Sequence, residues 1–181
     1  MDGPARARCI EEAGAPDDVE AARAGDRAAF GRLFQRLAPV VHGVLLARVR
    51  PAEADDLMQD VFLAALEKLP TLRDGAAFGG WLCAIARNRA ADFHRSRPRT
   101  VEIPEDLGRP DAERAEAERV LRAIRSLPEA YRETLVLRLV EGLSGPEIAE
   151  QVGLTPESVR VNLHRGMKML RERLGLEVDD G

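Results

Sequence analysis

The feature that most constrains this chain is an acidic, proline-punctuated segment that separates two stretches of helical patterning. Residues 98–114 contain three prolines, and residues 101–118 carry seven acidic side chains against two arginines. Such a segment cannot bury enough apolar surface to offset the entropy of ordering it. On both sides, apolar residues recur at spacings of three and four, as in amphipathic helices. We therefore expect an all-α fold with two small helical domains, at 19–97 and 115–176, joined by a flexible acidic linker over 98–114.

The composition agrees with a helical globular chain. Hydrophobic residues make up 45% and charged residues 32%, aromatic residues are scarce at 4%, and runs of β-branched residues are few. No apolar run is long enough for a transmembrane helix, and the first residues do not have the pattern of a secretory signal. Residues 1–18 and 177–181 are expected to be loose tails. Cys9 and Cys83 are outside any CxxC spacing, which favours a reducing cytoplasm over a disulfide framework.

Three helices are expected in the first domain. The first follows the apolar pattern of 19–45, in which Pro39 should break or kink the helix and Pro51 should end it. The second covers 54–69 and the third about 76–95. The second helix has one broad apolar stripe, formed by Leu57, Met58, Val61, Phe62, Ala65, Leu66 and Leu69.

Four helices are expected in the second domain. The first two cover 115–126 and 128–141, with the apolar residues of each facing inward. Ser144 is followed three residues later by Glu147, which predicts a capping box at the start of the third helix. Thr155 precedes a proline, a pattern typical of the cap and first position of a helix.

The last two helices have the pattern of a helix-turn-helix: a short capped helix, a turn with Gly153 and a longer basic helix. The last helix has an apolar stripe of Val159, Leu163, Met167, Leu170 and Leu174. Beside it lies a basic stripe of Arg160, His164, Lys168 and Arg171, with Arg165 next to it. A basic outward face suits phosphate attraction and major-groove reading. The alternative is a solvated surface helix, but the capped helix and glycine turn favour DNA binding.

The net charge of −4 conceals two basic blocks. Residues 83–100 contain five arginines and one aspartate, and residues 160–173 contain five basic residues and one glutamate. Packing alone does not explain the first block, because like charges in a short span repel one another unless an anion is present. Cationic side chains beside aromatic ones suit a single nucleic-acid strand, whose bases can stack.

No catalytic residue, metal site or cofactor is expected. His42, His94 and His164 lie far apart in the sequence, each without a histidine or cysteine three or four residues away. Asp55 and Asp56 are adjacent, so they point in different directions on a helix and make a poor acid–base pair. The sequence also lacks phosphate-binding glycine loops and the common hydrolase motifs.

Two sets of motifs resemble the extracytoplasmic-function (ECF) sigma factors of bacteria. DLMQDVF at 56–62, FGGWL at 78–82 and IARN at 85–88 resemble the second region of that family. LPE from Leu127, then GLS, EIA, VR and LHR up to Arg165, resemble the fourth region. The likeness covers most of 19–176 in the family's order and spacing. It implies a promoter-specificity subunit of RNA polymerase with an all-α fold made of regions 2 and 4.

The resemblance also assigns residues to three surfaces. Docking on the clamp helices of the largest polymerase subunit is implied for Asp56, Gln59, Asp60 and Leu63. Binding of the melted −10 strand, with Asn88 at the pocket for a flipped base, is implied for Arg87, Asn88, Arg89, Arg95 and Arg97. Recognition of the −35 duplex is implied for Thr155, Ser158, Arg160, Val161, His164, Arg165 and Lys168. The helix from Pro128 is implied to meet the flap of the second-largest subunit.

The expected partners are RNA polymerase core, promoter DNA and an anti-sigma factor, without membrane insertion. The expected place is the cytoplasm, in association with the nucleoid when the protein is active. Two other functions stay open at this point. One is a free-standing helix-turn-helix regulator whose first domain is a sensor or dimerisation module. The other is a protein-interaction adaptor whose basic faces never meet DNA. An enzyme is not expected.

Overall fold

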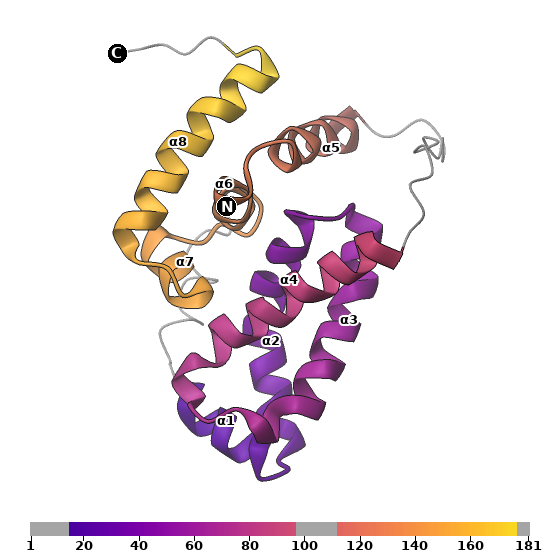
Figure 1. Ribbon diagram of the computed structural model, residues 1–181, viewed down its shortest axis with the longest axis vertical. Helices are drawn as coiled ribbons and strands as arrows, with labels where there is room; N and C mark the ends of the chain where they lie inside the picture. Colours follow the sequence, from indigo (N-terminus) through magenta and orange to yellow (C-terminus); the bar gives the residue numbers. More distant parts are fainter. Residues whose placement is uncertain (1–14, 97–111, 177–181) are drawn as a thin grey trace.

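The computed structural model describes residues 15–96 and 112–176. Within these ranges the regular structure is helical, which confirms the all-α prediction. Figure 1 shows α1–α4 gathered in a first unit and α5–α8 in a second unit beside it. Most of the predicted tails and linker lies outside the described residues, which leave out 1–14, 97–111 and 177–181.

The first unit is built from four helices and two short 3₁₀ turns. The turns, Leu69–Thr71 and Gly75–Ala77, connect the last two helices. The helices are α1 (Ala15–Arg23), α2 (Arg27–Leu46), α3 (Pro51–Lys68) and α4 (Phe78–Ser96).

A tight turn divides what the sequence predicted as one long helix into α1 and α2. Gly25 has a φ of +99°, a conformation that side chains other than glycine rarely adopt. The carboxylate of Asp26 then accepts hydrogen bonds from the backbone N–H groups of Ala28 and Ala29, which caps α2. The expected tail over 1–18 is corrected at its end, because α1 already begins at Ala15.

The expected break at Pro39 and the expected helix end at Pro51 are wrong. α2 continues through Pro39. Pro39 is exposed, so water can satisfy the carbonyl that loses its partner, while the neighbouring Leu37, Val40 and Val41 are buried and hold the helix in place. Pro51 does not end a helix; it occupies the first turn of α3, where its missing N–H would have no helical partner anyway.

The core of the first unit lies between α2, α3 and α4. Its largest fully buried side chains include Leu33 and Leu45 of α2 and Leu82 of α4, while Val61 of α3 is also fully buried. Phe62 contacts Phe34 with ring centroids 4.5 Å apart, and Trp81 packs partly buried beside Phe78. Leu66, which the sequence placed in the apolar stripe of this helix, is 47% exposed instead.

The second unit contains four helices, as predicted. Their bounds are α5 (Ala112–Arg125), α6 (Glu129–Leu139), α7 (Gly145–Val152) and α8 (Pro156–Leu174). α5 begins before the expected start at 115, so the last residues of the predicted linker are helical. Leu139 and Val140, expected on an inward side, are exposed at the end of α6.

The helix-turn-helix of the second unit has the predicted capping. Ser144 and Glu147 form a reciprocal capping box at the start of α7. Gly153 ends α7 in the left-handed conformation, with a φ of +72°. The hydroxyl of Thr155 accepts a hydrogen bond from the N–H of Ser158 and so caps α8. These local signals fix the angle at which α8 leaves the turn.

The two units are in direct contact through helices that are distant in sequence. α2 packs against α6, and α4 packs against α7. The approach is close at Gly43, where an added Cβ would lie 2.7 Å from Leu137 Cδ2. Among the described helices, none combines the length and the apolar character needed to cross a membrane.

Candidate nucleic-acid and polymerase interfaces

The outer face of α8 carries most of the residues predicted to meet a −35 duplex. Arg160, Val161, His164 and Arg165 line an open hollow of about 400 Å³ on this face. Lys168 is exposed one turn further along. The opposite face is held in the core, where Val159 and Leu170 are buried and Leu163, Met167 and Leu174 pack partly buried. The predicted division of α8 into an apolar and a basic stripe is therefore confirmed.

Two small hydroxyl side chains mark the N-terminal end of the same face. Thr155 and Ser158 are exposed, and their hydroxyls lie 2.8 Å apart. The Thr155 hydroxyl also caps the helix, so its position is fixed by the backbone. Unpaired N–H groups and the positive end of the helix dipole attract anions such as phosphate at this end.

The α4 residues predicted for a −10 strand do not all face the same way. Asn88 and Arg95 are exposed and Arg89 is partly exposed. Arg95 forms an ion pair with Asp92 on its own helix. Arg97 lies outside the described residues. The structure therefore leaves Asn88, Arg89 and Arg95 at least partly open to solvent in the second half of α4, whereas Arg87 contacts a different partner.

Arg87 points toward the second unit. It donates from Nε and Nη2 to the two carboxylate oxygens of Glu133 on α6, at 3.1 and 2.6 Å. Hydrogen bonding to Glu133 raises the pKa of Arg87, and burial opposes part of that increase. From the sequence, we inferred that packing does not explain the arginines of residues 83–100. That interpretation is incomplete, because Glu133 supplies an anion for one of them, Arg87.

One exposed face of α3 carries all four residues predicted to dock on the polymerase. Asp56, Gln59, Asp60 and Leu63 follow spacings of three and four, and each is exposed. Leu63 is 60% exposed, and Leu66 continues the apolar part of the face. An apolar side chain beside carboxylates on a rigid helix suits a protein contact more than a nucleic acid, which the carboxylates would repel.

The titratable side chains of the described residues do not cluster as metal ligands do. His42 lies between Glu141 and Asp55, with Nδ1 3.1 Å from Glu141 Oε1 and Nε2 3.5 Å from Asp55 Oδ1. The hydrogen bond to Glu141 raises the pKa of His42. Cys83 is buried, and burial raises the pKa of its thiol to about 12. Neither arrangement resembles a nucleophile beside a base.

Comparison with known proteins shows the family to which this chain belongs. The family model described as Sigma-70 region 2 matches residues 33–100, and the one described as Sigma-70 region 4 matches residues 117–170. The ECF RNA polymerase sigma factor SigD of Mycobacterium tuberculosis is 37% identical over 174 residues, which cover 86% of this chain and 82% of SigD. The chain belongs to the ECF sigma factors.

A further sigma factor agrees with this chain in sequence, and one solved structure agrees with it in fold. The RNA polymerase sigma factor CarQ of Myxococcus xanthus is 36% identical over 166 residues, covering 87% of this chain and 95% of CarQ. The solved structure of CnrH in complex with the cytosolic domain of CnrY superposes with a TM-score of 0.65 and 27% identity, covering 89% of this chain and 97% of CnrH.

Family membership settles the class of function. An ECF sigma factor is an alternative initiation factor that directs RNA polymerase to promoters, and it is not an enzyme. The resemblance drawn from the sequence motifs and the prediction of a non-enzymatic function are therefore confirmed.

Sequence reasoning missed the residues that join the two units of this ECF sigma factor. Glu133, Arg48, His42 and Glu141 all make polar contacts between the units. Nothing in the sequence singled out Glu133, which stands between the polar residues Arg132 and Thr134 of α6. It could not be interpreted, because its partner Arg87 is 46 positions away along the chain.

Proposed function

We propose that the second unit of this sigma factor reads the −35 element as duplex DNA with the outer face of α8. The observation that carries the proposal is the hollow formed by Arg160, Val161, His164 and Arg165 on the exposed side of a capped helix-turn-helix. A major groove admits such a helix, arginine suits the acceptor edge of guanine, and an apolar side chain suits the methyl group of thymine. Lys168, Thr155 and Ser158 are placed to hold the flanking phosphates.

The first unit captures the −10 element after melting. Asn88 presents an exposed amide in the second half of α4, which also carries Arg89 and Arg95. An amide can donate to and accept from a base edge, while guanidinium groups hold the backbone of the unpaired strand. Extruding a base costs stacking energy, which such contacts must recover. Arg87 belongs to this set once its contact with Glu133 is released.

The acidic and apolar face of α3 docks on the clamp helices of the largest polymerase subunit, and α6 is the helix proposed to meet the flap of the second-largest subunit. The exposure of Leu63 beside Asp56, Gln59 and Asp60 supports the first contact. Promoter binding then depends on both elements at the right separation, because the two units are tethered and mounted on one enzyme.

An inhibitory protein of the anti-sigma class is the further partner that we propose. CnrH, which this chain resembles in fold, was solved in complex with the cytosolic domain of CnrY. We also propose that this protein works in the cytoplasm and, when active, at the nucleoid, because a sigma factor acts where polymerase and the chromosome are.

The test of −35 reading is transcription with purified polymerase core after Arg160→Ala or Arg165→Ala. We expect each variant to lose about tenfold or more in −35-dependent initiation, since a good base contact contributes about 1–3 kcal/mol. Binding to core should be unchanged. Arg122→Ala, at an exposed arginine of α5, is the matched control and should behave as wild type. Promoters come from sequencing the transcript starts on a genomic library.

Three results would contradict the proposal. Equal loss of core binding and transcription in the α8 variants would make this face a polymerase contact. A promoter footprint by the chain alone, as strong as with core, would favour a free-standing regulator. Failure of the protein to redirect core at all would favour an adaptor.

A further inference from the structure

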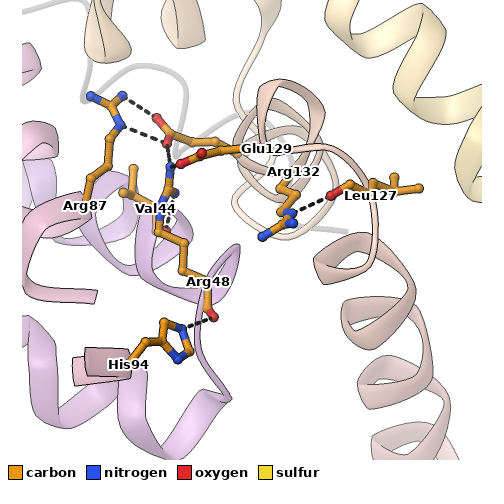
Figure 2. A network of polar contacts seen from close by, with 8 residues as sticks. Val44, Arg48, Arg87, His94, Leu127, Glu129 and Arg132 are labelled. Atoms are coloured by element: carbon orange, nitrogen blue, oxygen red, sulfur yellow. Dashed lines mark hydrogen bonds and ion pairs between the residues drawn. The ribbon is translucent and has the colours of Figure 1, made fainter. Parts of the chain in front are cut away.

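Glu133 of α6 lies buried between the two units, with only 7% of its surface exposed. Arg87 of α4 donates two hydrogen bonds to its carboxylate, and Arg48, just after α2, approaches one of the same oxygens at 2.9 Å. Figure 2 shows the side chains of Arg87 and Arg48 converging on this point from the first unit. One carboxylate of the second unit thus forms ion pairs with two guanidinium groups of the first.

Arg48 is itself held in place by further contacts. Its Nη1 donates to the carbonyl of Val44 at 2.9 Å, and its Nη2 lies 3.3 Å from Glu129. Its own carbonyl is 3.0 Å from His94 Nε2. The network in Figure 2 therefore extends from the exposed end of α4 to the first turn of α6.

Close backbone contacts accompany this network on either side. Gly43 of α2 approaches Leu137 of α6, and Gly79 of α4 approaches Gln151 of α7. The thiol of Cys83 donates to the carbonyl of Gln151 at 3.4 Å. The interface is thus formed along α2 and α4, and its ion pairs are specific to one relative placement of the two units.

The ion pair and the DNA contact compete for the same donors. Arg87 uses Nε and Nη2 on Glu133, the pair of donors with which an arginine also binds a phosphate bidentately. A carboxylate buried without a partner is costly, so Glu133 is compatible with the closed arrangement only while Arg87 and Arg48 hold it. Binding of Arg87 to a phosphate must therefore be coupled to release of Glu133 into water.

We propose that Glu133 is a latch: it keeps the two units together and withholds Arg87, so that capture of the −10 strand requires the units to separate. The inference rests on the proposed role of α4 in strand capture. Because the strand binds only the open form, the apparent affinity falls by the fraction of molecules that are open. The coupling is reciprocal, so the strand also opens the protein.

The first experiment uses Glu133→Gln in the full chain with Cys9→Ser, so that Cys83 is the remaining thiol. Glutamine keeps the shape of the side chain but cannot neutralise two guanidinium groups. We expect faster alkylation of Cys83 by iodoacetamide, because opening removes α7 from its thiol. We also expect about tenfold tighter binding of fluorescein-labelled oligodeoxythymidine, within the range usual for coupled sites. Glu150→Gln, at an exposed glutamate of α7, should change neither.

The second experiment locks the closed arrangement reversibly. A Cβ placed on Gly79 lies 3.8 Å from the Cα of Gln151, which suits a disulfide between Gly79→Cys and Gln151→Cys in a background with Cys9→Ser and Cys83→Ser. The oxidised protein should lose at least tenfold in oligodeoxythymidine binding, and dithiothreitol should restore it. The reduced form of the same sample controls for folding.

Different results would contradict the proposed latch and the proposed strand-binding role of α4. If the oxidised protein binds the oligonucleotide as well as its reduced form, or if Glu133→Gln alters neither alkylation nor binding, the latch is overturned. If alkylation speeds up in Glu133→Gln but no form of the protein binds the oligonucleotide, the interface opens as described and α4 is not the strand-binding surface.

Discussion

Arg160 and Arg87 carry the same charge but differ in how freely they can bind DNA, because their surroundings differ. Arg160 is 80% exposed, and its ion pair with the equally exposed Glu157, at 3.7 Å, contributes little to stability. It stays available to a base edge or phosphate. Arg87 is half-buried against Glu133 and must exchange one anion for another before it can bind DNA. The free-energy cost of that exchange, and not the charge, decides how readily Arg87 can bind DNA.

Val161 is the apolar member of the α8 hollow, and we expect it to contact the methyl group of one thymine in the −35 element. It is 37% exposed between Arg160 and His164. Replacing that thymine with deoxyuridine removes only the methyl group and should weaken promoter binding of the holoenzyme about fourfold, as expected for about 0.8 kcal/mol per buried carbon. Val161→Ala should be nearly insensitive to the same replacement.

The measurement is a deoxyuridine scan of the −35 element by fluorescence anisotropy with holoenzyme. Val140→Ala, at an exposed valine after α6, serves as the control and should retain the wild-type sensitivity. If no single position responds in wild type, or if Val161→Ala responds equally, Val161 does not read a methyl group.

At the scale of the helices, the sequence predicted those features that depend on residues close together along the chain. The capping box of Ser144 and Glu147, the cap at Thr155 and the two stripes of α8 were all predictable, because each depends on residues a few positions apart. The course of α2 through Pro39 was not, since it depends on which side of the helix the core covers. The pairing of Arg87 with Glu133 was equally inaccessible, because nothing in the sequence fixes how two separate helical units dock.

Close packing of α6 on α8 leaves little room for a side chain at Gly166. A Cβ on Gly166 would lie 3.0 Å from Leu135 Cδ1 and 3.1 Å from Tyr131 Cβ. The Tyr131 atom is fixed to the α6 backbone, so the helices would have to move apart. We expect Gly166→Ala to destabilise the protein by about 1 kcal/mol, as overpacking outweighs the gain in helix propensity.

The same substitution at Gly31 provides a control of opposite sign. Gly31 lies exposed in α2, where an added Cβ meets nothing within 4 Å. Gly31→Ala should therefore stabilise the protein by up to about 1 kcal/mol. Chemical denaturation of both variants measures the two changes in the free energy of unfolding. Stabilisation by Gly166→Ala would mean that α6 and α8 are not as closely packed as described.

At the scale of the whole molecule, the two units are joined both by ion pairs and by a continuous cluster of buried apolar side chains. Glu133 holds two arginines, and Glu141 holds His42, so the second unit contributes carboxylates and the first contributes cations. These ion pairs are specific to one relative placement of the units, because they depend on geometry. The separation of the units that we propose for strand capture must therefore break these ion pairs.

His42 makes the association of the two units depend on pH. Its neighbours determine whether the stabilisation grows or falls as the pH rises. Glu141 from the end of α6 and Asp55 of α3 both face the imidazole and raise its pKa above the ordinary 6.5. Because the pKa is raised in the folded protein, this stabilisation is complete below pH 6.5 and is lost as the pH rises through the raised pKa. Since the imidazole is partly exposed, the effect should stay within about 1 kcal/mol.

The corresponding measurement is the thermal unfolding midpoint of wild type and of His42→Gln between about pH 6 and pH 8. Wild type should lose up to a few degrees relative to the variant as the pH rises, because the variant lacks the charge that His42 gains at low pH. His42→Gln in the Glu141→Gln background should add nothing, since the carboxylate that raises the pKa of His42 most is already gone. A variant that follows the wild-type curve across this range would show that His42 does not couple the two units to pH.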